Sequence, residues 1–234
     1  FAVVPFGSDL TLFGKKVPLV ITDLNVGLLY VFALSSLGVY GVAMGGWASN
    51  SKYSLLGGIR GAAQMISYEL ALGLSLVPIV MLADSFSIVE IVKAQEKYPF
   101  ILVQPVAFVI FMISAMAESK RIPFDLPEAE NELGAGYHTE YSGIRFGLFF
   151  LGEYVHLQVL GALVAVLFLG GWRGPILPPP VWLFIKIIFV ALIMIWVRGT
   201  LPRLRYDQLM ALGWKILIPA ALINIMVTGA ILLI

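Results

Sequence analysis

The sequence predicts an all-α fold, a polytopic bundle of transmembrane helices with a short amphipathic helix at the membrane surface. Of its 234 residues, 60% are hydrophobic and 12% are charged, whereas a soluble domain averages about 25% charged residues. A membrane span takes about 20 apolar residues. Six stretches are candidates, and because no long polar linker separates them we expect a single transmembrane domain over 1–234. The six expected spans are 22–46, 63–83, 100–117, 144–170, 181–198 and 208–233.

The connections between these spans carry turn and surface signals. The first link, 48–62, is polar and rich in glycine, which predicts a loop. Pro78 predicts a kink in the second span. Residues 85–97 place apolar side chains on one helical face and charged ones elsewhere, which is typical of a helix lying on the membrane. Three consecutive prolines predict that the loop 171–180 is extended.

The distribution of Lys and Arg predicts the orientation of the chain. Alternating the six spans places the links 48–62, 118–143 and 199–207 on one side. By the positive-inside rule this side faces the cytoplasm, so we expect a multi-pass protein of the bacterial plasma (inner) membrane, or alternatively of the mitochondrial inner membrane. The links on that side, with their flanks, hold Lys52, Arg60, Lys120, Arg121, Arg145, Arg198, Arg203 and Arg205, against Lys15, Lys16, Lys93, Lys97 and Arg173 opposite.

Composition also excludes several classes of site. The chain has no cysteine, which excludes thiolate-bound iron–sulfur clusters, haem on a CxxCH motif and disulfides. Two histidines are too few for a His-rich metal site, so we expect no metal site. A net charge of +1 predicts no nucleic-acid partner.

The stretch 117–141, AESKRIPFDLPEAENELGAGYHTEY, is the predicted functional centre. It holds six of the 14 acidic residues between two apolar spans. Asp125 and Glu128 fit the start of a short capped helix ending at Gly134 or Gly136, but a cap does not explain Glu130, Glu132 and Glu140. Carboxylates held close together cannot all stay ionised, so some pKa values rise toward neutrality and the cluster can pass protons. A solvated acidic loop is the alternative.

Two further carboxylates lie within predicted spans. Glu69 interrupts the apolar run ISYELALGLSL, and a carboxylate there costs roughly 2.5–3.5 kcal/mol on insertion scales, which favours a functional, interior-facing role. The alternative places Glu69 near the interface, bonded to Tyr68 or Arg60. Glu153 and His156 form one ExxH spacing, whereas a di-iron carboxylate site needs two such motifs. We therefore expect His156 to be a helix-packing residue and not a ligand.

Three stretches of the chain carry a family resemblance. The loop AESKRIPFDLPEAENELGAGYHTEYSG with the following FGLFFLGEY, the segment RGAAQMISYELALGL, and RLRYDQLMALGWKILIPAAL resemble the membrane subunit called H in bacteria of the proton-pumping NADH:quinone oxidoreductase, respiratory complex I. The resemblance covers essentially the whole chain. The family has eight spans, so this chain is expected to be an N-terminally truncated portion that lacks part of the quinone site.

The resemblance implies a role and its residues. This subunit forms the membrane half of a quinone tunnel where a peripheral iron–sulfur arm docks, beside neighbouring membrane subunits, and couples reduction of ubiquinone or menaquinone to proton translocation. It binds no flavin, haem or cluster itself. The implied proton path comprises Glu69, Asp125, Glu128, Glu130, Glu132, Glu140 and Glu153. The implied quinone-binding residues are Arg121, Phe146, Phe149 and Phe150, and the supporting charges are Arg60, Arg203 and Arg205.

Other functions remain open at the level of the sequence. The phenylalanines share one helical face, and such a stripe by itself favours helix packing or an interface belt over a quinone channel. A proton-coupled secondary transporter using Glu69 and Glu153 would predict repeat symmetry and broken helices at midplane, neither of which the sequence indicates. A membrane anchor subunit of a hydrogenase or ferredoxin-linked complex is a homologous alternative that uses no quinone. The intact PFDLPEAE loop and the phenylalanine face favour quinone, on the basis of the resemblance.

Overall fold

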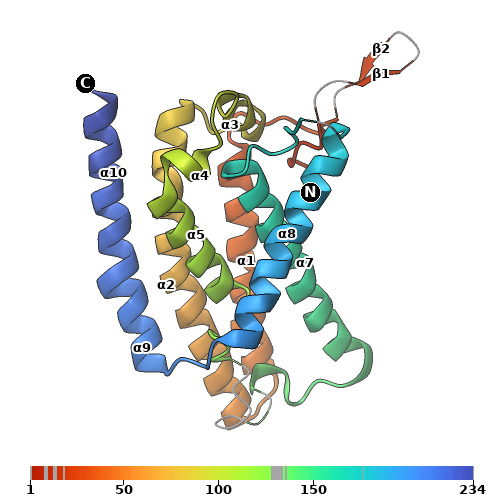
Figure 1. The fold of residues 1–234 in the computed structure, drawn as a ribbon. Coiled ribbons are helices and arrows are strands. Elements are labelled where there is room, and N and C mark those ends of the chain that lie inside the picture. Colours follow the sequence, from red (N-terminus) through yellow and green to blue (C-terminus); the bar gives the residue numbers. More distant parts are fainter. Residues whose placement is uncertain are drawn as a thin grey trace.

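The computed structural model confirms the all-α class. It describes residues 2–7, 10–12, 15–17, 19–127, 134, 136–175 and 177–233. For residues 10–12 and 15–17 it describes the backbone only. Helices form a bundle (Figure 1), and a two-stranded antiparallel hairpin, β1 (Leu10–Leu12) and β2 (Lys15–Val17), stands outside it.

Five helical stretches of the described chain are long and apolar enough to cross a membrane. The last of them is continuous from Tyr206 to Leu232 and passes through a π-helical segment, a feature that often marks functional positions. The five are α1 (Gly27–Ala48), α2 (Lys52–Ala83), α7 (Gly143–Leu167), α8 (Pro179–Thr200), and the run of α9 (Tyr206–Ala211), η2 (Leu212–Leu217) and α10 (Ile218–Leu232).

The predicted span 100–117 is present in two pieces, α4 (Phe100–Val103) and α5 (Pro105–Glu118). Pro105 has no N–H to donate and disfavours helical geometry at Gln104, so the helix breaks there. The Gln104 side chain instead bonds to α10, donating to the Thr228 hydroxyl at 2.9 Å and accepting from the Asn224 amide at 3.0 Å. This polar contact joins α10 to the break.

The prediction of a loop over 48–62 is wrong, because α2 already begins at Lys52. The glycines there serve close packing. A Cβ on Gly58 would lie 3.1 Å from the Gly46 Cα, and one on Gly57 would lie 3.1 Å from the backbone of Gly136. Only Gly allows backbones to approach this closely. Helix α2 also continues through Pro78.

The surface helix predicted at 85–97 is a seven-residue helix, α3 (Ile88–Ala94), whose apolar residues Ile88, Ile91 and Val92 are buried. The prolines expected to be extended instead begin α8 at Pro179, because proline suits the first turn of a helix. In α3 the burial of apolar side chains sets the extent of the helix, and in α8 the prolines set its first residue.

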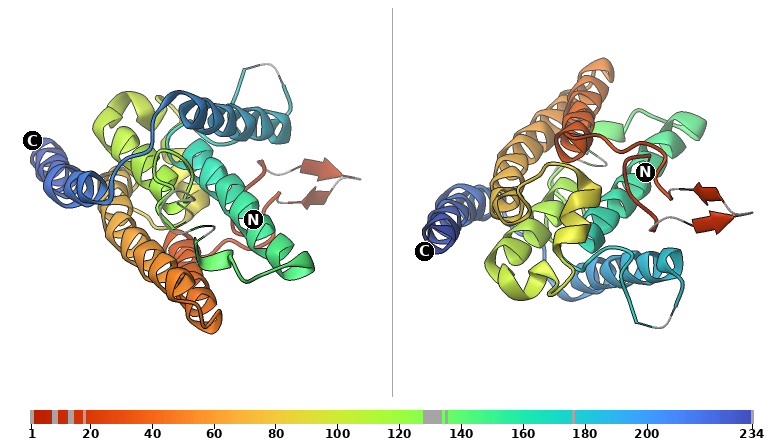
Figure 2. Two further views of the ribbon diagram at one scale, coloured as in Figure 1. Left: turned by 90° about the horizontal axis from the view of Figure 1, so that it is seen from below. Right: turned by 90° about the horizontal axis from the view of Figure 1, so that it is seen from above.

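Helix α2 is the central element of the bundle, and its Tyr68, Ala71, Leu72 and Ile79 are fully buried. Figure 2 shows α10 at the edge of the bundle in both views. The α1–α2 turn and the α8–α9 link lie at the end of the bundle where α5 ends and α7 begins (Figure 1). Apart from Glu69, the described candidate site residues gather at this end.

Candidate functional site

The segment after α5 is held against the bundle by side chains of α2. The Gln64 amide of α2 donates to the carbonyls of Ala117 at 2.8 Å and Phe124 at 2.6 Å. Phe124 packs against the Tyr68 ring, with 5.7 Å between centroids. The predicted Gly-rich link contributes here too, since Gly57 lies against the backbone of the loop. The loop is thereby positioned next to α2 and α7.

Arg121 and Glu153 form a buried ion pair. The Arg121 guanidinium lies 3.2 Å from Glu153 Oε2, and the Tyr137 hydroxyl donates to Glu153 Oε1 at 3.0 Å. Arg121 also lies over the Tyr154 ring, 4.6 Å from its centroid. Glu153 is only 8% exposed. A predicted quinone-binding residue and a predicted proton-path residue are therefore in direct contact.

Glu118 is a second buried carboxylate at this site, and it is not among the residues of the predicted proton path. It is the last residue of α5 and is 2% exposed. Its Oε1 lies 3.3 Å from His156 Nε2 on α7, while its Oε2 has no hydrogen-bond partner in the described chain. The signal in the sequence was the ExxH spacing, which places His156 on the same helical face as Glu153.

Glu118, Glu153 and His156 line one cavity of about 310 Å³. Its polar side is formed by Glu118, Lys120, Glu153 and His156, and its apolar side by residues of α1 together with Phe149 of α7. Two carboxylates, a histidine and a lysine thus face a common space large enough for several water molecules.

Asp125 lies beside this cluster in the loop. Its carboxylate pairs with Arg203 at 3.0 Å, and the short helix that it was expected to cap lies outside the described residues. Burial raises the pKa of Asp125 to about 6, although Arg203 opposes this shift. Arg203 is thus the counter-charge of a loop acid. Arg205 is exposed and Arg60 is partly buried.

Glu69 lies apart from the cluster, on a partly buried position of α2. The Ser36 hydroxyl of α1 donates to its Oε1. The expected partner Tyr68 instead donates its hydroxyl to the Leu209 carbonyl at 2.8 Å. Glu69 lines a separate, largely apolar cavity of about 560 Å³ between α1 and α2. Ser35, the neighbour of Ser36 on α1, lines the cavity of Glu153. Two adjacent serines of α1 are therefore associated with the two cavities, Ser35 with that of Glu153 and Ser36 with that of Glu69.

The remaining loop acids differ in position. Glu128, Glu130 and Glu132 lie outside the described residues. Glu140 is exposed and lines a surface hollow with Ser49 and Arg145. Among the described residues no cluster of three His, Cys, Asp or Glu side chains could hold a metal ion.

The phenylalanine face of α7 is divided between two neighbours. The Phe146 and Phe150 rings contact one another in a tilted arrangement, with 4.7 Å between centroids, and both contact the His138 ring, at 5.3 and 5.8 Å. Phe149 contacts Tyr137 at 5.5 Å. Burial lowers the pKa of His138, which favours its neutral form. The start of α7 is therefore aromatic next to the Arg121–Glu153 pair.

The chain is similar to known proteins over nearly its whole length. Residues 1–229 match the NADH dehydrogenase family. The NADH-quinone oxidoreductase H subunit numbered 2 of Syntrophobacter fumaroxidans is 84% identical over 98% of this chain and 70% of its own length. The H subunit numbered 1 of Geobacter metallireducens is 68% identical over 100% of this chain and 71% of its own. The H subunit of Thermomicrobium roseum is 52% identical, with 98% and 70% covered. The chain therefore belongs to the NADH dehydrogenase family, among relatives named as the H subunit of NADH-quinone oxidoreductase.

Proposed function

We propose that this chain is a membrane subunit of a proton-pumping NADH:quinone oxidoreductase, where it forms part of the quinone tunnel and couples quinone reduction to proton movement. The observation that carries the proposal is the cavity shared by Glu118, Glu153 and His156, with Arg121 bonded to Glu153. Buried ionisable groups beside membrane spans are rare without a function. The names of the relatives supply the redox partners, NADH and quinone.

The chemistry of the pair suggests how coupling works. Arg121 balances the buried charge of Glu153 at 3.2 Å. Movement of Arg121 toward a quinone headgroup would leave that charge uncompensated, and uptake of a proton by Glu153 relieves it. The cavity supplies water and the adjacent Glu118–His156 pair as the next carriers. A change at the quinone thus becomes a proton moved into the membrane domain.

The quinone itself, ubiquinone or menaquinone, is proposed to pass the aromatic start of α7. Phe146 and Phe150 present ring faces suited to an isoprenoid tail, and Arg121 lies nearby, beside Tyr154 and Glu153. We assign no flavin, haem or iron–sulfur cluster to this chain, which has no cysteine. A peripheral iron–sulfur arm and neighbouring membrane subunits are the proposed partners. The bacterial relatives favour the bacterial plasma membrane over the mitochondrial one.

The test compares buried and exposed carboxylates in the assembled complex. Glu153→Gln and Glu118→Gln remove a transferable proton from the cavity but keep the side-chain shape. Glu90→Gln, at an exposed position of α3, is the matched control. We expect the two cavity variants to lower quinone reduction and proton uptake together, by roughly 10²-fold or more where proton transfer is lost, and the control to match wild type. Wild-type rates in both cavity variants would remove the cavity from the mechanism.

A further inference from the structure

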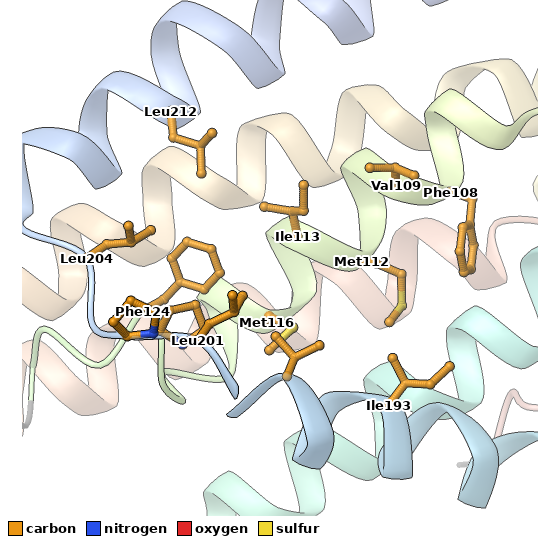
Figure 3. Close-up of a pocket in the computed structure, with 13 residues that line it drawn as sticks. Phe108, Val109, Met112, Ile113, Met116, Phe124, Ile193, Leu201, Leu204 and Leu212 are labelled. Carbon is orange, nitrogen blue, oxygen red and sulfur yellow. The ribbon is translucent and has the colours of Figure 1, made fainter. Parts of the chain in front are cut away.

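A third cavity, of about 650 Å³, lies between α5, α8 and η2 and is lined by none of the ionisable groups above. All of its lining residues are apolar or proline, and Figure 3 shows their side chains gathered around one space. Its floor is the α5 face that carries Phe108, Met112 and Met116, and its walls include Ile193 of α8 and Leu212 of η2. A cavity of about 300–1,000 Å³ suits a ligand of small-molecule size.

The cavity covers only part of the membrane thickness. From Phe108 to Met116 the α5 axis rises about 12 Å, compared with about 30 Å of hydrocarbon in a bilayer. Leu201, Pro202 and Leu204 of the α8–α9 link line the foot of the cavity, and this link crosses one end of the bundle (Figure 1). The cavity is thus a groove that starts at one membrane face and ends near the middle.

Arginines flank the foot of this groove. Arg198 follows the lining residue Val197, and Arg205 follows Leu204. Both are exposed, and neither pairs with a carboxylate in the part of the chain that the structure describes. Arg203, between them, is engaged by Asp125. Two guanidinium groups with no carboxylate ion pair in the described chain carry the charge that a phosphate group binds.

We propose that this groove binds one acyl chain of an anionic phospholipid, whose phosphate lies at Arg198 and Arg205. The alternative occupant, a helix of another subunit, fits less well. A spanning helix would need a groove through the whole bilayer, about 30 Å, whereas this groove follows α5 for only about 12 Å. The arginines lie on the side expected to face the cytoplasm, where anionic lipids are concentrated.

Neighbouring aromatic residues support the headgroup position. Trp196 is 71% exposed on α8 and Tyr206 is 38% exposed at the start of α9. Exposed Trp and Tyr are enriched at the level of lipid headgroups. Both lie within the same short stretch as the two arginines, so the foot of the groove carries the residue types of a membrane interface.

The test uses the purified complex in nanodiscs that contain phosphatidylglycerol with a diazirine halfway along one acyl chain. After illumination, labelled peptides are mapped by mass spectrometry. We expect label on α5 around Met112 and Met116. Arg198→Gln with Arg205→Gln should reduce this label roughly tenfold or more, because each basic residue adds to the attraction of an anionic lipid. Lys52→Gln, an exposed cation at the same end, should leave it unchanged.

A second variant tests the groove without altering charge. Val109 lines the cavity and is 52% exposed, so Val109→Trp fills the groove from the lipid side without disturbing the buried core. We expect it to abolish the label on Met116. Recovery of the intact complex shows that each variant is folded.

Three results would overturn the proposal. Equal labelling by the matching phosphatidylcholine probe, unaffected by the arginine variants, would show non-specific bilayer contact only. Loss of label on addition of excess quinone would assign the groove to quinone. A crosslink to another subunit from a photoreactive residue at position 109 would show that the groove is a helix interface.

Discussion

The Nε2 atom of His156 lies 3.3 Å from Oε1 of Glu118, across the contact between α7 and α5. Glu118 is 2% exposed, and no other charged group of the described chain pairs with it. His156 is thus the polar side chain that lies at ion-pair distance from a buried carboxylate. It contributes to helix packing, but through a contact with the candidate proton path.

We therefore expect His156→Leu to impair both folding and coupling. Leaving a buried acceptor unsatisfied costs about 1–3 kcal/mol, and more when it is charged. Gln keeps an N–H donor, so His156→Gln is the matched control and should retain more stability and more proton uptake. The measurements are thermal inactivation of the assembled complex and quinone-linked proton uptake in proteoliposomes. Identical behaviour of the Leu and Gln variants would show that His156 does not act on Glu118.

The Arg203–Asp125 pair predicts a specific pH dependence. Burial raises the pKa of Asp125 to about 6, and the nearby Arg203 opposes the shift. A carboxyl with a raised pKa contributes stability that is fully present below its unfolded pKa of 3.8 and is lost as the pH rises through about 6. Arg203→Gln removes the largest cause that lowers this pKa, so the midpoint should move above 6.

Infrared difference spectra can follow the Asp125 carboxyl directly. The protonated carbonyl band that disappears in Asp125→Asn should titrate near pH 6 in the wild-type complex and at higher pH in Arg203→Gln. Arg205→Gln is the control, because Arg205 is exposed and does not pair with Asp125. A midpoint unchanged by Arg203→Gln would show that this ion pair does not control the loop acid.

Contacts of the site between residues close in the sequence could be predicted, whereas contacts between residues far apart in the sequence could not. Helical spacing was enough to place Glu153 and His156 together, and to pair Phe146 with Phe150. The contacts of Arg121 with Glu153, His156 with Glu118 and Arg203 with Asp125 join segments 32, 38 and 78 residues apart, respectively. They depend on how α5, α7 and the α8–α9 link meet, which no local pattern contains.

The errors in the predicted elements have physical causes. The glycines of 48–62 predict a loop, yet Gly57 and Gly58 lie in helix α2. Glycine occurs at these two positions because the backbones of the loop and of α1 approach α2 closely there. The break at Gln104 was missed because the run 100–117 is almost uniformly apolar, so hydropathy concealed the effect of Pro105. Composition predicts that a segment is in the membrane more reliably than it predicts where a helix begins.

Lys186 predicts a stability effect far from the candidate site. Its ammonium donates to the carbonyls of Leu169 at 2.6 Å, Gly171 at 2.9 Å and Arg173 at 2.7 Å, beyond the end of α7. Lys186→Met keeps the apolar stem and leaves three acceptors unsatisfied. Since a hydrogen bond to a charged group contributes about 1.5–3 kcal/mol, we expect a marked loss of thermal stability of the complex. Lys215→Met, at an exposed position, is the control and should match wild type.

The predicted orientation can be tested by labelling introduced cysteines in sealed vesicles, since the chain has none of its own. Ser119 in the acidic loop is unsuitable because it is 4% exposed. Lys52 and Lys97 are exposed, at the start of α2 and after α3 respectively, near opposite ends of α2. We expect Lys52→Cys to react only from the cytoplasmic side and Lys97→Cys only from the other. The reverse pattern would invert the topology.

Glu69 gives the sharpest test of a proton path beyond the cavity. It lies among apolar residues of α2, and the Ser36 hydroxyl donates to it. Tyr68 cannot substitute as the nearby hydroxyl, because it is engaged by the Leu209 carbonyl. Glu69→Gln keeps the shape and the contact with Ser36 but removes the transferable proton, whereas Glu69→Asp keeps the proton and shortens the side chain by one methylene.

We therefore expect Gln at position 69 to depress coupled turnover strongly, and Asp to be tolerated better. Glu69 should be more sensitive than Glu153, because Glu153 has Arg121 and Tyr137 bonded to it and Glu118 and His156 in the same cavity, which offer alternative carriers. Ser36→Ala is the companion variant, since it removes the hydrogen bond without removing the carboxylate. The measurement is quinone reduction together with proton uptake in assembled complexes. If Gln and Asp at position 69 behave alike while Ser36→Ala reproduces both, then Glu69 has a structural role that depends on its bond to α1, and proton exchange there is not part of coupling.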